Sequence, residues 1–231
     1  MMPFGRYKRK KNNMYRYLFF DLDGTLTNPK EGITKCVQYA LHCMGIEEPD
    51  TDRLIPFIGP PLVDSFMEYY KMTVDEAKQA VVKYRERFRD KGIFENELLE
   101  GVPEMLERLK SQGKILAIAS SKPEEFVVRI LEKFGIRQYF DEVTGARMDE
   151  KRSAKSEVIE ETMHRLGLGA DDWPQILMIG DRRHDVEGAK KCGIDCLGIY
   201  VGFAAPGELE TAGAAYIVHT VPQMETFLLT H

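Results

Sequence analysis

Two acidic residues follow the first apolar run of the chain. Residues 20–26 read Phe-Asp-Leu-Asp-Gly-Thr-Leu, so Asp21 and Asp23 stand two positions apart. Neighbouring carboxylates repel each other unless a cation or a proton offsets their charge. Gly24 permits a tight turn there, and Thr25 supplies a hydroxyl group. A simple Asx turn needs only one acidic residue, so this string favours a cation-binding site instead.

A second acidic pair follows a later apolar run. Gly180 and Asp181 come directly after residues 176–179, and Asp185 stands four positions beyond Asp181. Acidic residues are common in the first turn of any helix because of the helix dipole, so Asp185 alone indicates little. Several carboxylates at one edge of a sheet, however, form the oxygen-rich site that Mg²⁺ prefers. The predicted metal-binding residues are Asp21, Asp23, Asp181 and Asp185.

Two serines end a third apolar run. Ser120 and Ser121 follow residues 115–119. A hydroxyl group and the free N–H groups of a helix N-terminus can hold a phosphate, although Ser121 by itself fits a simple helix cap equally well. Lys155 gains significance only from its place between these serines and the second acidic pair, since a lone lysine on a helix is usually solvated.

The elements that position these residues follow from the hydrophobic pattern. Continuous apolar runs predict strands buried on both faces, as in a parallel sheet. Periodic stretches that stop at a glycine predict helices between those strands. The result is an α/β fold with a Rossmann-like parallel sheet. The expected strands are 17–20, 115–119, 176–179, 196–200 and 215–218, and the expected helices are 102–112, 124–134 and 155–166.

The interval between Asp21 and Ile115 is too long for one crossover connection. It contains three helical patterns, at 33–45, 61–71 and 74–91, without strands between them. We therefore expect an inserted helical cap domain at 31–99 and a discontinuous catalytic core at 17–30 and 100–231. A basic N-terminal extension at 1–16 is expected to be disordered.

Composition narrows the class of protein. The chain has 231 residues, a net charge of −5 and 43% hydrophobic residues, which suits a packed core but not nucleic-acid binding by simple attraction. No apolar run fits a signal peptide or a membrane span. The four cysteines lack metal-site spacing and are expected to be reduced thiols. We expect a cytoplasmic monomer or homodimer without nucleic-acid or membrane partners.

The ordered set of motifs resembles the haloacid dehalogenase superfamily, in particular its phosphatases with a helical cap. The resemblance covers residues 17–231, and its first motif is the most specific. The matching residues are Asp21 to Thr25, then Ser120, then Lys155, and finally Gly180, Asp181 and Asp185.

Within the superfamily, the chain looks closest to the phosphoglycolate phosphatase-like branch. The segment at Gly59 and Pro60 resembles the substrate-facing loop of that branch, although a proline near a helix start is also common. Many relatives carry an acidic residue shortly after the first motif, where this chain has Thr27 and Asn28. That departure leaves the core chemistry intact but weakens the transfer of details about cap closure.

The resemblance implies a two-step phosphoryl transfer with Mg²⁺ as cofactor and a small phosphorylated metabolite as substrate. Asp21 is the expected nucleophile, which forms an aspartyl-phosphate, and Asp23 is the expected general acid and base. The main-chain carbonyl of Asp23 is expected to join Asp21 and Asp181 at the metal, with Asp185 positioning the ion or its waters. The expected phosphate and substrate contacts are Ser120, Lys155, Gly24, Thr25, Ser121, Gly59 and Pro60.

Other activities fit the same residues. A 5'-nucleotidase or a pyrophosphatase would use the same site, and a phosphomutase of the β-phosphoglucomutase kind would retain every core residue. A non-catalytic protein that binds a phosphate ligand is the alternative from another class, because a fold does not by itself determine function.

Overall fold

A six-stranded parallel sheet forms the centre of the computed structural model, which describes residues 15–148 and 152–231. The strand order is β5-β4-β1-β6-β7-β8 in the described part of the chain. This confirms the predicted α/β class and Rossmann-like parallel sheet. The strands are β1 (Tyr17–Phe20), β4 (Ile115–Pro123), β5 (Glu142–Ala146), β6 (Ile176–Gly180), β7 (Asp195–Ile199) and β8 (Tyr216–Val218).

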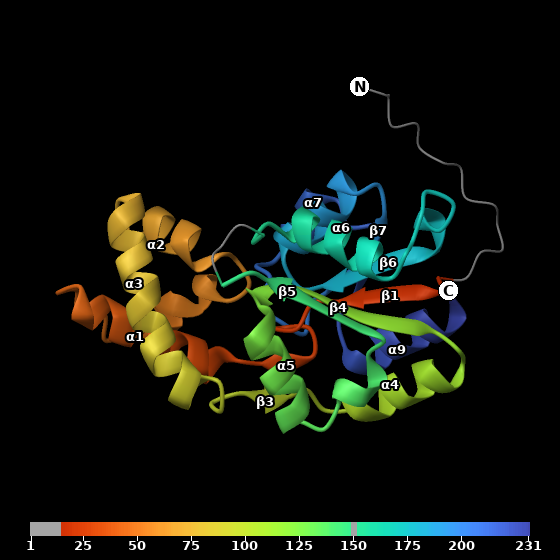
Figure 1. Ribbon diagram of the computed structural model, residues 1–231, viewed down its shortest axis with the longest axis horizontal. Helices are drawn as coiled ribbons and strands as arrows, with labels where there is room; N and C mark the ends of the chain where they lie inside the picture. The colour runs from red at the N-terminus through yellow and green to blue at the C-terminus, as the bar shows by residue number, and fades with distance from the viewer. Residues whose placement is uncertain (1–14, 149–151) are drawn as a thin grey trace.

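Both faces of the sheet are covered by helices, as Figure 1 shows. In β1, Leu18 and Phe20 belong to one buried cluster, whereas Tyr17 and Phe19 belong to the other. The continuous apolar run of β1 thus serves two cores at once. One face carries α6 (Lys155–Arg165) and α7 (Arg183–Lys191), with α8 (Glu208–Ala212) beside α7. The other carries α4 (Val102–Ser111), α5 (Glu124–Lys133) and α9 (Val221–Thr230).

Strand β5 is an element that we did not predict. It reads Glu-Val-Thr-Gly-Ala and so lacks the continuous apolar run that marks the other strands. It lies at the edge of the sheet and pairs only with β4, where Ala117 is opposite Glu142. Residues 142–146 therefore form a strand because they pair with β4, and their own sequence does not predict it.

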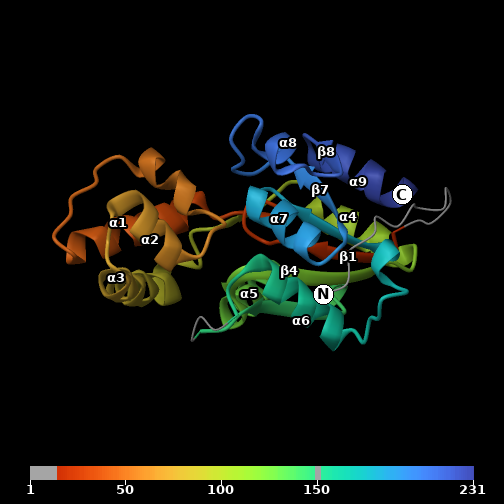
Figure 2. The same cartoon turned by 90° about the horizontal axis from the view of Figure 1, so that it is seen from above.

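The helices of residues 30–96 form a separate group beside the sheet, which we call the helical insertion (Figures 1 and 2). Two short antiparallel strands, β2 (Thr27–Asn28) and β3 (Glu97–Leu98), join the insertion to the sheet. Three helices lie close to the ranges expected from the sequence: α1 (Lys30–Cys43), α2 (Leu62–Tyr70) and α3 (Val74–Arg87), which the π-helical turn η2 (Phe88–Gly92) continues. The 3₁₀-helix η1 (Thr51–Phe57) was not predicted.

The predicted disordered extension, residues 1–16, includes two residues that belong to the fold. Tyr15 is 1% exposed, and its hydroxyl group donates to Asp195 Oδ2 at 2.6 Å. The backbone N–H of Arg16 donates to the carbonyl oxygen of Gln175 at 2.9 Å. Residues 15 and 16 therefore belong to the fold, because the side chain of Tyr15 and the backbone of Arg16 are paired with it. The rest of the expected extension lies outside the described residues.

Two compositional expectations can be compared with the structure. All four cysteines are free thiols, as predicted, and three of them are buried. In the residues described, no helix combines the length and the apolar character that crossing a membrane requires.

Candidate active site

The carboxyl ends of three adjacent strands bring the predicted residues together. Phe20 of β1 pairs with Ile118 of β4 and with Ile179 of β6. Because parallel strands in register end at the same edge, the residues that follow them meet there. Asp21, Ser120 and Asp181 thus lie at one edge of the sheet, beside the helical insertion.

Three buried carboxylates form a cluster at this edge. Asp21, Asp181 and Asp185 each offer an oxygen within 4.8 Å of the others, and they are 3%, 0% and 1% exposed. The backbone N–H of Phe203 donates to Asp181 Oδ2 at 2.7 Å, whereas Asp181 Oδ1 accepts no hydrogen bond from any described residue. Burial, and then the charges of Asp185 and Asp21, raise the pKa of Asp181 well above its usual value. Burial also raises the pKa of Asp185 to about 6, although Lys155 opposes that shift.

Lys155 offsets part of this negative charge. Its Nζ lies 2.8 Å from Asp21 Oδ1 and 2.8 Å from Asp185 Oδ1, and it donates to the carbonyl oxygen of Ala119 at 3.0 Å. Burial would lower the pKa of Lys155, but the two carboxylates outweigh burial and raise it. One ammonium group among three carboxylates leaves an excess of negative charge. Together with the unpartnered oxygen of Asp181, this excess fits a divalent cation with oxygen ligands.

The turn after β1 packs directly against the carboxylate cluster. Gly24 has φ of +81°, and a Cβ atom there would lie 2.2 Å from Asp181 Oδ2. Glycine is therefore required both by the backbone conformation and by the close approach. Thr25 is fully buried. Neither Gly24 nor Thr25 is among the residues that line the pocket described below, so the structure gives them a place behind the site.

Asp23 faces a different partner from the other aspartates. Its Oδ2 lies 2.5 Å from Lys122 Nζ, and its side chain is not part of the three-carboxylate cluster. Burial raises the pKa of Asp23, and the nearby charge of Lys122 acts in the opposite direction. The metal contact predicted for Asp23 runs through its main-chain carbonyl and stays a prediction.

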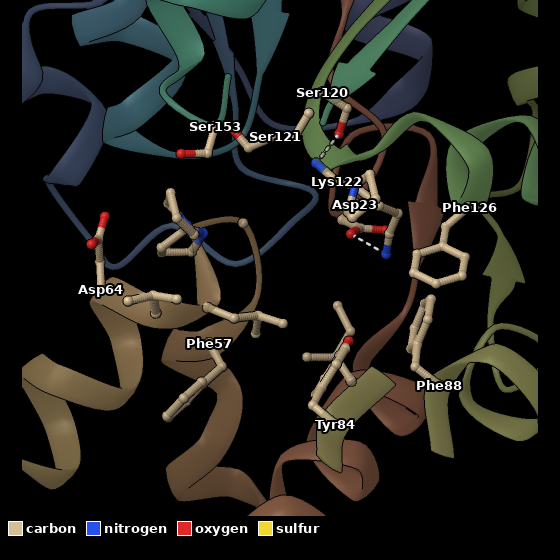
Figure 3. A pocket seen from close by; sticks show the side chains of 18 of the residues that line it. Asp23, Phe57, Asp64, Tyr84, Phe88, Ser120, Ser121, Lys122, Phe126 and Ser153 are labelled. Carbon is tan, nitrogen blue, oxygen red and sulfur yellow. Dashed lines mark hydrogen bonds and ion pairs between the residues drawn. The ribbon is translucent and has the colours of Figure 1, made fainter. Parts of the chain in front are cut away.

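An open pocket with a cavity volume of about 200 Å³ lies between the sheet edge and the helical insertion. Figure 3 shows Lys122 and Asp23 on the sheet side, with Phe57 and Tyr84 on the insertion side. Six of the predicted site residues line this pocket, together with an aromatic wall. The six are Asp21, Asp23, Ser120, Ser121, Gly59 and Pro60, and the aromatic residues are Phe57, Tyr84, Phe88 and Phe126.

The sequence analysis missed several basic residues of the site, among them Lys122 and Arg182, and also Arg85 and Arg147 of the pocket lining. Lys122 directly follows the two serines, and its Nζ also lies 4.8 Å from the ring centroid of Phe88. Arg182 directly follows Asp181 and is only 8% exposed. Lys122 and Arg182 could have been noticed because each directly follows a motif residue. A basic residue at a strand end is usually solvated, however, so this position alone does not predict a role in the site.

Several known proteins are similar to this chain. The profile of the family described as "Haloacid dehalogenase-like hydrolase" matches residues 18–199. A protein of Pseudomonas aeruginosa named 5'-nucleotidase is 42% identical over 94% of this chain and 97% of its own length. The tyrosine-protein kinase PtkA of Mycobacterium tuberculosis is 33% identical over 87% of this chain and 68% of its own length. A crystal structure of a predicted phosphatase from Clostridium acetobutylicum is 43% identical, with a TM-score of 0.91, and covers 94% of this chain and 100% of its own.

Proposed function

The chain belongs to the haloacid dehalogenase-like hydrolase family and is a phosphoric monoester hydrolase, and we propose that it is a Mg²⁺-dependent phosphatase of nucleoside 5'-monophosphates. The observation that supports the mechanism is the meeting of Asp21, Asp181 and Asp185 at one sheet edge, where Lys155 pairs with Asp21 and Asp185. The substrate class rests on the aromatic pocket and on the relative named 5'-nucleotidase.

The cation would be held by Asp21, Asp181 and the main-chain carbonyl of Asp23, with Asp185 positioning it. When bound, Mg²⁺ would supply positive charge that keeps Asp21 ionised and reduces its repulsion with the phosphate. The unpartnered Oδ1 of Asp181 supports this assignment, because a buried carboxylate oxygen without a hydrogen bond is costly.

In the first step, a carboxylate oxygen of Asp21 attacks phosphorus and the bond to the leaving oxygen breaks. Asp23 gives its proton to that oxygen, so the alcohol leaves neutral and Asp21 carries the phosphoryl group. In the second step, a water attacks the phosphoryl group and the bond between phosphorus and the Asp21 oxygen breaks, which frees the Asp21 carboxylate and releases phosphate, while Asp23 takes a proton from the water. Ser120 and Lys155 hold the phosphate oxygens as charge develops on them. The raised pKa of Asp23, caused mainly by burial, favours the protonated form that the first step needs.

The pocket wall supports a leaving group with a flat apolar part. Phe88 lies 5.3 Å from Tyr84 and 5.2 Å from Phe126, measured between ring centroids. These three rings are 1–5% exposed, so the wall suits apolar contact with the flat part of a nucleobase. Phosphoglycolate, our expectation from the sequence, stays the second candidate because Gly59 and Pro60 line the pocket.

The free thiols support a cytoplasmic location.

The test is phosphate release from nucleoside 5'-monophosphates, phosphoglycolate, pyrophosphate, sugar phosphates and an aryl phosphate. Each is assayed with Mg²⁺, with chelator and with Asp21→Asn, and Asp171→Asn serves as an exposed control of equal charge change. We expect nucleotides to be hydrolysed best, and chelator or Asp21→Asn to abolish release.

Hydrolysis that persists in Asp21→Asn would refute the assignment of Asp21 as the nucleophile. A preference for phosphoglycolate or pyrophosphate would show that nucleoside 5'-monophosphates are not the substrate class. Interconversion of a sugar phosphate without net release would favour a phosphomutase, and phosphate-ester binding without turnover of any substrate would favour a non-catalytic binding protein.

A further inference from the structure

Arg182 connects the helical insertion to the acidic edge of the sheet. It directly follows Asp181, and its backbone N–H donates to Asp185 Oδ2 at 3.0 Å. Its side chain spans the two parts of the molecule, since Nη1 donates to the carbonyl oxygen of Ile58 at 2.5 Å and Nε donates to Glu208 Oε1 at 3.0 Å. One guanidinium group therefore has one partner in the insertion and one in the core.

The core partner is itself held in place. Glu208 also accepts from the backbone N–H of Arg183 at 2.8 Å and of Ala205 at 3.0 Å. The same loop supplies the N–H of Phe203 to Asp181 Oδ2. The anchor of Arg182 and one of the predicted metal ligands are thus fixed by one short segment, residues 203–208.

The insertion partner leads straight into the pocket. Ile58 is fully buried, and the next two residues, Gly59 and Pro60, line the pocket. Gly59 has φ of +103°, and a Cβ atom there would lie 3.0 Å from Arg182 Cγ. The stem of Arg182 therefore packs against the backbone of the pocket-lining segment, in addition to the hydrogen bond at Ile58.

We propose that Arg182 is a positioning residue that fastens the pocket-lining segment 58–60 of the insertion to the metal-binding turn 181–185. The planar guanidinium can donate to two acceptors at a fixed angle, which the single ammonium group of a lysine cannot reproduce. A hydrogen bond from a charged donor to a buried carbonyl is among the stronger ones, so its loss releases the segment. The consequence for catalysis rests on the proposed function, whereas the fastening itself does not.

The direct measurement is hydrogen exchange of backbone amides in the full-length protein. Arg182→Gln is compared with Arg182→Lys and with Arg183→Gln, a neighbouring exposed residue of equal charge. In Arg182→Gln, we expect exchange across residues 54–66 to rise about 10-fold or more, while β1 and β6 keep wild-type exchange. Arg182→Lys should resemble Arg182→Gln, and Arg183→Gln should resemble the wild type.

Unchanged exchange at 54–66 would overturn the proposal. An equal rise throughout β1 and β6 would also overturn it, since that result indicates general destabilisation. Full restoration by lysine would contradict the need for two simultaneous donors. Because exchange is measured without turnover, failure of the proposed function would leave this result standing.

A kinetic double-mutant cycle gives an independent readout through Gly59→Ala. Both Arg182→Gln and Gly59→Ala should lower kcat/KM for the preferred substrate about 10-fold or more, mainly through KM. If they break one connection, the double variant should lose little more than the worse single variant. Losses that multiply would show that the two residues act separately, and the fastening would be refuted.

Discussion

Lys122 Nζ lies 2.5 Å from Asp23 Oδ2, in an ion pair whose two side chains are 7% and 8% exposed. The same Nζ lies 4.8 Å from the ring centroid of Phe88, which belongs to the helical insertion. Burial raises the pKa of Asp23 and Lys122 opposes the rise. Burial and Lys122 are therefore the largest influences on the protonation state of the proposed general acid, ahead of the charges of Asp21 and Lys155, and Lys122 also contacts the insertion.

Lys122→Gln should shift the pH dependence of hydrolysis. Without the Lys122 cation, only the charge of Lys155 still opposes burial, and the pKa of Asp23 rises further. The alkaline limb of kcat, where Asp23 loses the proton it must donate, should move to higher pH, and kcat at the optimum should fall about 10-fold from poorer orientation. A pH profile with an aryl phosphate measures both effects. An alkaline limb that stays in place or moves to lower pH would contradict this role.

Asp21→Asn should separate activity from stability. Loss of the nucleophile should lower kcat on the order of 10⁴-fold. The substitution also removes one of three clustered carboxylates, so the metal-free protein should keep or raise its Tm. Phosphate release and thermal unfolding in chelator measure the two effects, with Asp171→Asn as the control. A clear fall in Tm would mean that the ion pair of Asp21 with Lys155 outweighs the repulsion.

Gly24→Ala and Gly45→Ala form a matched pair. Both glycines have positive φ, +81° and +79°, but a Cβ at Gly24 would meet Asp181 whereas a Cβ at Gly45 would meet nothing within 4 Å. Gly45→Ala should cost only the backbone strain, about 1–2 kcal/mol of unfolding free energy. Gly24→Ala should cost more and should also weaken Mg²⁺ binding, because Asp181 must move. Chemical denaturation and Mg²⁺ titration test the pair, and equal costs in both would disprove the contact argument.

Mg²⁺ should stabilise the protein more at pH 7.5 than at pH 5. The folded pKa of Asp185 is raised to about 6 from 3.8, so the metal-free protein loses stability as pH rises from about 4 to about 6. At pH 5 the ion must displace a proton, whereas at pH 7.5 Asp185 is already ionised. Displacing the proton of Asp185 at pH 5, about one unit below its pKa, weakens Mg²⁺ binding about 10-fold. The Mg²⁺-induced rise in Tm should therefore be about 3–5 °C smaller at pH 5.

Thermal scans with and without Mg²⁺ at the two pH values provide the measurement. Asp185→Asn should lose the part of the pH dependence that Asp185 contributes, whereas Asp181, whose pKa is also raised, keeps its own part. Equal stabilisation by Mg²⁺ at both pH values in the wild type would show that Asp185 does not titrate against the ion.

Much of the site was predictable because its signals are local. Asp21, Ser120 and Asp181 each end an apolar run, and parallel strands bring such ends to one edge. The carboxylate cluster and the parallel sheet followed from these runs, and α1, α2 and α3 of the insertion followed from helical periodicity. Strand β5 was missed because its residues carry no apolar run and only its pairing with β4 makes it a strand.

The sequence by itself determined which acidic residues meet and on which elements they stand, since hydrophobic periodicity is encoded within each segment. Only the tertiary structure decided the partners of the basic residues. Arg182 and Ile58 are 124 positions apart, and Lys122 reaches both Asp23 and Phe88. A long flexible side chain finds its acceptor through packing between distant elements, and no local pattern records where that acceptor lies.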